Sequence, residues 1–327
     1  MPPGRATGPP AVAVADLAAP GRTGAGLGLA LVSAVAFGLS GPFAGALIAA
    51  GWSATGAVLV RLGGAAAILL VVIAVTRPGV LAALRADGPA LLLYGVLAAA
   101  GVQVAFFNAL QYLPVAIALL LEYLGPILVI GWVWLVRGQP PSARTVLGAV
   151  IALVGLSLVV QVWSGLGLRV EGVVWGLVAA VCQASYFLVA DRAGSTTPPL
   201  VLAGVGMTIG TVVVALLGLL GALPIVVGTD VTGVVLAGVD VGWPVAATLL
   251  IVVSTVIAYL TGVAALARIG ATRGSLIALL EVLVSAVASW LLLGQVLTPV
   301  QALGGALILA GLALTNTARP ATLAEPG

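Results

Sequence analysis

Long apolar stretches, separated by short interruptions of glycine, proline or charge, run along almost the whole chain. A helix needs about 20 apolar residues to cross a bilayer, and lipid favours helices because their backbone hydrogen bonds close within one segment. Ten such stretches occur, at about 25–50, 54–76, 88–110, 115–136, 145–162, 172–190, 199–222, 244–266, 274–293 and 299–316. The pattern predicts an all-α integral membrane protein with ten transmembrane helices, a disordered tail at 1–24 and a short tail at 318–327.

Composition excludes most other classes of protein. Only 12 basic and 9 acidic residues occur among 327, and mean hydropathy is +1.30, so a soluble protein could not cover its surface with these charges. The absence of histidine excludes the usual Ser-His-Asp, zinc-protease and haem sites, and the single Cys182 excludes an intramolecular disulfide. The basic residues are arginines scattered along the chain. We therefore expect no catalytic residue, no metal, no cofactor and no nucleic-acid partner.

The arginines orient the predicted spans. Ten of them fall on one side of the bundle, namely Arg5, Arg22, Arg77, Arg85, Arg137, Arg144, Arg192, Arg268, Arg273 and Arg319. Only Arg169 falls on the other side, and Arg61 lies within a span. Because cytoplasmic loops carry the excess of positive charge, we predict a multi-pass protein of the cell (inner or plasma) membrane with both termini in the cytoplasm.

The chain repeats itself. A shift of 156 positions aligns residues 109–156 with 265–312, with 13 identical pairs among 48. The informative pairs are Trp134/Trp290, Gly138/Gly294, Gln139/Gln295, Gly148/Gly304 and Gly155/Gly311. The arginines of one copy's loop are missing from the matching loop of the other. The arginines therefore occur in the loops on one side of the membrane, whichever copy of the repeat the loop belongs to.

Each half contains five predicted spans, an odd number, so the second copy must lie inverted in the membrane. We predict two inverted five-helix repeats, at 25–162 and 172–317, joined by a linker at 163–171. Inverted repeats are typical of secondary transporters, in which the binding site lies between the halves near the midplane of the membrane.

Two segments carry a resemblance to a known family. The sequences ALQYLPVAIALLLEYLGP at 109–126 and LIALLEVLVSAVASWLLLGQVLT at 276–298 resemble tandem modules of the EamA-type, ten-helix drug/metabolite transporter superfamily. The resemblance implies inverted five-helix halves, alternating access, and export or exchange of small metabolites such as amino acids, with no enzymatic reaction. The chain departs from the family pattern at Val282, where a proline kink is expected to be missing. It departs again at Gln139 and Gln295, where the family usually has glutamate.

Three ionisable side chains lie inside predicted spans: Arg61, Glu122 and Glu281. A charge near the bilayer centre costs about 2.5–3.5 kcal/mol even on the most lenient scale, which makes such residues candidates for substrate binding or coupling. Pro126 has no N–H to bond the carbonyl of Glu122, so it should bend the helix beside that carboxylate. The two acids could carry proton coupling. For Arg61, snorkelling to the interface or pairing with an acid is favoured over contact with an anionic substrate.

Other polar side chains recur at helical spacing and point to a cavity. The candidates are Ser40, before an expected kink at Pro42, with Gln103, Phe107, Gln183, Tyr186 and Ser254. Ser33 and Phe37 share the stripe of Ser40, and Ala258, Thr261 and Ala265 share that of Ser254. The small residues Gly148, Ala152, Gly155, Gly304 and Gly311 suit helix packing, either within the fold or between the protomers of a homodimer.

We therefore predict a secondary active transporter, exporting or exchanging a small metabolite, with the substrate and the lipid bilayer as its partners. Two alternatives stay open from the residues alone. One is an intramembrane lipid-modifying enzyme, which would require a cluster of acids or metal ligands at one interface. The other is a non-transporting membrane scaffold, for which buried carboxylates have no obvious use.

Overall fold

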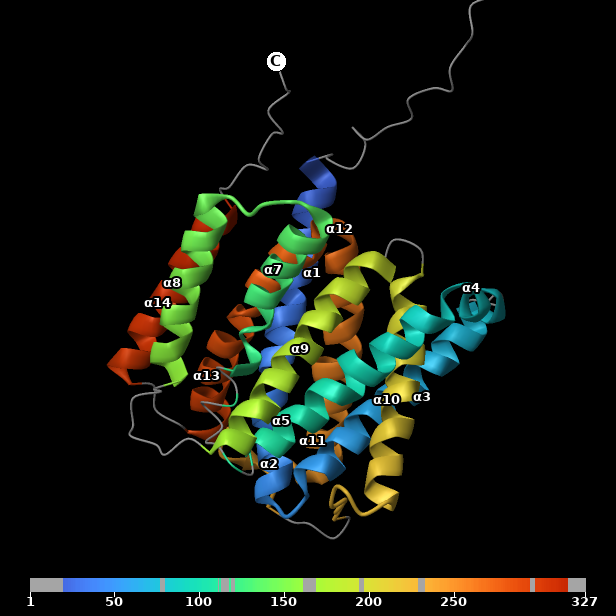
Figure 1. Cartoon of the computed structure of the whole chain (residues 1–327). Coiled ribbons are helices and arrows are strands. Elements are labelled where there is room, and N and C mark those ends of the chain that lie inside the picture. Colours follow the sequence, from blue (N-terminus) through green and yellow to red (C-terminus); the bar gives the residue numbers. More distant parts are fainter. Residues whose placement is uncertain are drawn as a thin grey trace, which may run out of the picture.

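The chain folds into a bundle of helices in the computed structural model, which describes residues 20–76, 80–110, 112, 118, 121–160, 169–193, 197–228, 233–294 and 298–316 (Figure 1). The helices are α1 (Pro20–Gly38), α2 (Ser40–Ala49), α3 (Ala54–Thr76), α4 (Val80–Leu93), η2 (Tyr94–Gly101), α5 (Val102–Leu110), α7 (Gly125–Arg137), α8 (Ala143–Val160), α9 (Val170–Ala193), α10 (Pro199–Leu219), α11 (Gly242–Ile251), η3 (Val252–Ile257), α12 (Ala258–Ala278), α13 (Leu280–Leu293) and α14 (Pro299–Asn316). Two short strands, β1 (Val235–Leu236) and β2 (Val239–Asp240), pair antiparallel in the connection before α11.

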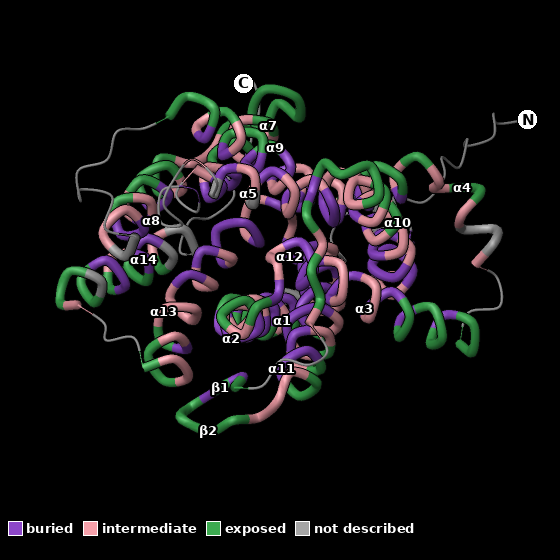
Figure 2. Tube along the Cα trace, turned by 90° about the horizontal axis from the view of Figure 1, so that it is seen from below, coloured by how far each residue is buried: buried purple, intermediate pink, exposed green. Residues whose placement is uncertain are grey.

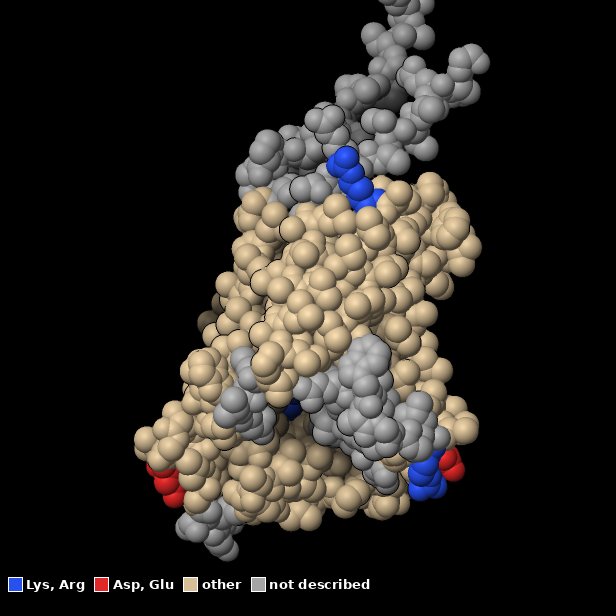
Figure 3. All heavy atoms as spheres, turned by 90° about the vertical axis from the view of Figure 1, so that its left-hand side faces the viewer, with Lys and Arg blue, Asp and Glu red and all other residues tan. Residues whose placement is uncertain are grey.

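The outer surface matches a lipid environment. Six helices in the described residues are long and apolar enough to cross a membrane, and the four segments Gly125–Arg137, Ala143–Leu158, Leu280–Leu293 and Ala302–Gly311 are shorter apolar helices. Large apolar side chains such as Leu135 and Leu219 are more than four-fifths exposed. On the face seen in Figure 3 the charged side chains lie at the two ends, and the surface between them is uncharged except for a basic group inside a hollow. An all-α membrane protein is confirmed at this level.

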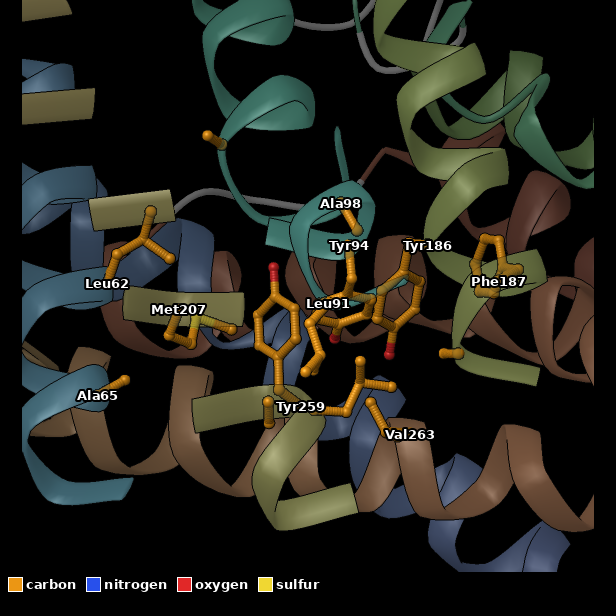
Figure 4. Close-up of a cluster of buried hydrophobic side chains, with 14 of the residues drawn as sticks. Leu62, Ala65, Leu91, Tyr94, Ala98, Tyr186, Phe187, Met207, Tyr259 and Val263 are labelled. Carbon is orange, nitrogen blue, oxygen red and sulfur yellow. The ribbon is translucent and has the colours of Figure 1, made fainter. Parts of the chain in front are cut away.

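Helices α1 and α12 pack along each other at the centre of the bundle and are buried on the sides that face their neighbours (Figure 2). The main hydrophobic core lies beside them. Its largest fully buried side chains include Leu62, Leu69, Tyr94 and Met207, which come from α3, η2 and α10 (Figure 4). Helices α8 and α14 form a separate pair at one side of the bundle (Figure 1).

Three breaks interrupt the apolar helices. The first lies at Leu39, between α1 and α2, where Pro42 cannot bond the carbonyl four residues earlier. The second lies at Tyr123–Leu124, directly before Gly125 and Pro126 open α7. A helix break therefore lies within three residues of each of these two prolines.

The third break, at Leu279, occurs without a proline. Val282 stands where the family has the proline, yet α12 ends at Ala278 and α13 begins at Leu280. The amides of Leu279 and Val282 bond carbonyls three residues back, at 3.2 and 3.3 Å, so the chain tightens into a turn. Close packing accompanies the turn, because the Cβ that Gly38 lacks would lie 2.8 Å from the backbone oxygen of Glu281.

Other irregularities lie in the third and eighth predicted spans. Segments η2 and η3 are π-helical, which adds a residue to the turn and rotates the face that follows. Gly270, with φ of +77°, breaks α12 internally. Helix α12 therefore consists of two helical segments, and their break falls between the spans expected at 244–266 and 274–293.

Helices α8 and α14 approach through their glycines. A Cβ on Gly155 would lie 2.5 Å from the carbonyl oxygen of Gly304, and a Cβ on Gly311 would lie 2.5 Å from the carbonyl oxygen of Gly148. Of the two interpretations of these small residues, packing within the fold is the one observed. A homodimer would have to use other faces.

Candidate functional site

A cavity of about 120 Å³ lies at the centre of the bundle, between α1, α3, α5, α9 and α12 and the helix breaks. Its polar and charged lining consists of Ser33, Ser40, Arg61, Gln103, Glu122, Gln183, Tyr186, Tyr259 and Glu281. Binding pockets for larger organic ligands are commonly about 300–1,000 Å³, so this cavity suits a small metabolite. Residues on both sides of the 163–171 segment contribute to it.

The helix breaks supply the cavity with its key polar groups. Ser40 directly follows the break at Leu39, Glu122 directly precedes the break at Tyr123, and Glu281 lies two residues after Leu279. A broken helix leaves backbone groups without partners and turns adjacent side chains inward, which is how transporters build sites at membrane depth. The local sequence therefore brings these three side chains to one place.

Arg61 lies on α3 and is only 7% exposed. Its Nη1 donates to Ser40 Oγ at 2.9 Å, its Nε donates to Thr255 Oγ1 at 3.3 Å, and its Nη2 donates to the backbone oxygen of Ser254 at 3.3 Å. Arg61 is thus buried among neutral acceptors, and no described carboxylate lies within the 4.0 Å of an ion pair.

Glu122 is buried and held by a neighbouring helix. Gln183 on α9 donates from Nε2 to Glu122 Oε1 at 3.1 Å, while Gln183 Oε1 is buried without a partner among the described residues. Gly125 allows this approach, because a Cβ there would lie 2.6 Å from Gln183 Oε1. The glycine that opens α7 thus admits the side chain that orients the carboxylate.

Glu281 faces the same cavity from α13. A side-chain hydrogen bond joins it to Tyr123, the residue next to Glu122. The two carboxylates and Arg61 therefore share one small space, with a cation held by neutral groups and two acids each bonded by a neutral donor. Within the described part of the chain, no three His, Cys, Asp or Glu side chains gather as a metal site would require.

Aromatic rings form one wall of the cavity (Figure 4). The ring centroids of Tyr186 and Tyr259 lie 5.8 Å apart, and the two rings are nearly perpendicular. The ring centroids of Phe37 and Tyr259 lie 4.8 Å apart. Tyr94 lies 5.9 Å from Tyr186, with its hydroxyl buried and without a described partner. Edge-to-face rings pack rigidly, so this wall fixes the shape of the cavity.

Most of the residues singled out by sequence reach the cavity. Ser40, Arg61, Gln103, Glu122, Gln183, Tyr186 and Glu281 all line it. Ser254 does not line it and contributes its backbone oxygen to Arg61, while its buried hydroxyl has no partner among the described groups. The side chain of Phe107 lies outside the described residues.

Sequence reasoning missed Tyr259 and Phe187. The stripe extrapolated from Ser254 ran through Ala258, Thr261 and Ala265, and of these only Ala265 lines the cavity, together with Tyr259 and Gly262. The π-helical turn of η3 contains Ser254 and adds a residue, so a spacing of 3.6 residues per turn misses Tyr259 by one position. Phe187 follows Tyr186 on α9 and could have been found only from the width of the cavity.

Comparisons with known proteins identify the family and the fold. A family model described as the EamA-like transporter family matches residues 24–161 and again residues 170–317. The threonine/homoserine exporter RhtA from three Escherichia coli strains, K12, CFT073 and O157:H7, is 28% identical over 261 residues, which span 76% of this chain and 79% of the relative. A solved structure described only as "Crystal structure of protein" has a TM-score of 0.67 and 21% identity, covering 90% of this chain and 96% of the other. This last likeness concerns the fold alone.

Proposed function

Because the chain belongs to the EamA-like transporter family, we propose that it exports a small amino acid by alternating access, with the central cavity as its binding site. Membership makes the chain a multi-pass membrane transporter and not an enzyme, which excludes the lipid-modifying alternative. A relative named as a threonine/homoserine exporter supports hydroxylated amino acids of that size as the substrate class. Exchange of one such amino acid for another belongs to the same proposal.

One observation carries the proposal. The cavity lies between the two family modules, with Arg61 and Glu122 from the first and Gln183 and Glu281 from the second. Buried charges of both signs in a space of about 120 Å³ suit a small ligand that is itself charged at two points. A scaffold would gain nothing from them.

We propose that the fold consists of ten transmembrane helices in two inverted repeats, bounded as predicted at 25–162 and 172–317. Features separated by about 156 positions support this. The breaks at Tyr123–Leu124 and Leu279 correspond, and η3 corresponds to the last six residues of η2. Helices α7 and α13 both end at a glycine with positive φ, at Gly138 and Gly294.

The orientation proposed from the arginines has support from the arrangement of the ends. Helix α1 begins and α14 ends at the same, upper end of the bundle in Figure 1, as an even number of crossings requires. Arg137 on α7 pairs with Asp191 on α9 at 2.8 Å, and both lie on the side assigned to the cytoplasm. We propose that both termini are cytoplasmic.

The proposal is tested by flux in proteoliposomes. The wild-type chain should move L-threonine or L-homoserine, and an imposed pH gradient should change the rate if Glu122 or Glu281 exchanges the coupling proton. Glu122→Gln and Glu281→Gln should then each lower the flux, and at least one should lose its response to the gradient, since an amide cannot release a proton. The uptake of radiolabelled amino acid over time measures both the rate of flux and its response to the pH gradient.

The matched control is Glu171→Gln, because Glu171 is exposed at the start of α9, outside the cavity. It should transport as the wild type does. Gradient-dependent flux at the wild-type rate in both cavity variants would rule out coupling through these carboxylates. No flux of any small amino acid in the wild type would refute the proposed function.

A further inference from the structure

Among the described residues, no carboxylate lies in contact with Arg61, the buried cation of the cavity. An arginine is always charged in a protein, and buried charges are normally paired, because removing an ion from water is costly. Arg61 is held only by a serine hydroxyl, a threonine hydroxyl and one backbone oxygen among the described groups. These neutral acceptors fix its position and leave its charge unneutralised by direct contact.

The hydrogen-bond count leaves room for a ligand. A guanidinium has five N–H donors, one on Nε and two on each terminal nitrogen. The three described bonds use one donor from each nitrogen, so one N–H on Nη1 and one on Nη2 remain. Two donors on adjacent nitrogens match the two oxygens of a carboxylate, which arginine typically binds in a bidentate manner.

A partner for a positive group lies close to this position. Glu281 lines the same cavity as Arg61 and belongs to the other family module. In an α-amino acid one carbon separates the carboxylate from the ammonium, so the acid nearest the arginine is the one that the ammonium can reach. Glu122 lines the cavity too, but its Oε1 already accepts a hydrogen bond from Gln183 at 3.1 Å.

We propose that Arg61 binds the carboxylate of the transported amino acid and that Glu281 binds its ammonium group. This assignment rests on the proposed function and deepens it, because it makes the cavity selective for zwitterions over amines and simple carboxylic acids. Each charged group of the ligand is matched by an opposite charge on a different module, so one ligand joins the two halves.

The test is calorimetric titration of the purified full-length chain with three ligands. They are L-threonine, L-threoninamide, which lacks the carboxylate, and 3-hydroxybutanoate, which lacks the ammonium. The wild type should bind threonine at least about tenfold more tightly than either analogue, because each loses a charge-assisted contact. This comparison needs no variant, so it stands even where a substituted protein fails to fold.

Two variants should separate the roles. Arg61→Gln should lose the preference for threonine over threoninamide and keep the preference over 3-hydroxybutanoate, while Glu281→Gln should show the reverse. Arg85→Gln and Glu171→Gln, both at exposed positions, should keep both preferences. If Arg61 and Glu281 had only a structural role, replacing either one would weaken the binding of all three ligands together.

Each outcome decides something. A wild type without preference among the ligands, an Arg61→Gln protein that keeps both preferences, or variants that lose both together would overturn the assignment. Threonine binding with the expected preferences, but without flux in proteoliposomes, would refute the proposed function and leave the assignment standing. A wild type that binds none of the three would refute both.

Discussion

Replacing Ala278 with phenylalanine is expected to reduce amino-acid flux to the background of empty liposomes. Ala278 lines the cavity at the end of α12, one residue before the break at Leu279. A phenyl ring at this position would enter a space of about 120 Å³ that packed aromatic rings also line. The rings cannot move aside at low cost, since overpacking a rigid core costs about 1–3 kcal/mol. The substrate should therefore be excluded.

The measurement is flux per folded molecule, with the folded fraction taken from size-exclusion chromatography. Ala67→Phe on α3 is the matched control, because Ala67 is exposed on the apolar surface and does not line the cavity. It should transport as the wild type does. An Ala278→Phe protein that is folded and retains more than about half of the flux would contradict the proposal that this cavity is the transport site.

Replacing Gly155 with leucine is expected to destabilise the fold more than any other single change considered. A Cβ at this position would meet only close atoms of α14, at 2.5 Å from Gly304 O, 2.7 Å from Ile308 N and 2.9 Å from Leu307 Cβ. Two of these atoms are backbone and cannot rotate away. The helices would have to separate, which breaks the packing of the pair, at a cost of about 3 kcal/mol or more.

Thermal unfolding in detergent measures this effect, and Gly311→Leu should reproduce it, since its Cβ would meet Gly148 and Ala152 in the same way. Gly131→Leu is the control. Gly131 lies in the middle of α7, and its Cβ would have nothing within 4 Å. If the Gly155→Leu and Gly131→Leu proteins unfold at the same midpoint temperature, α8 and α14 do not approach each other as closely as described.

Much of this fold could be predicted because the membrane simplifies the physics. Apolar length identifies helices, since lipid permits little else, and proline explains the bends at Pro42 and Pro126. Glu122 and Glu281 could be singled out because a carboxylate inside a membrane span is energetically costly and usually has a function. The break at Leu279 could not be predicted in the same way, because no residue there forbids a helix and the close approach to Gly38 is a contact between distant segments.

The environment of Arg61 shows a second limit. Its burial depends on Ser40, Thr255 and Ser254, which lie on α2 and η3, and no spacing along α3 reveals them. Tyr259 was missed because a π-helical turn changes the face that a regular period predicts. The first failure concerns contacts between distant segments, and the second concerns a local irregularity of the backbone. Both affect side chains that line the cavity.

Protection of a single cysteine by substrate tests the central claim most directly. Cys182 is the only cysteine, so Cys182→Ala with Ala278→Cys leaves one thiol, at the edge of the cavity. A small cationic methanethiosulfonate reagent should modify it, and L-threonine or L-homoserine should slow the reaction in a saturable manner, while L-threoninamide should not. Modification at the same rate with and without these amino acids would contradict the claim that the transported amino acid binds between the two modules.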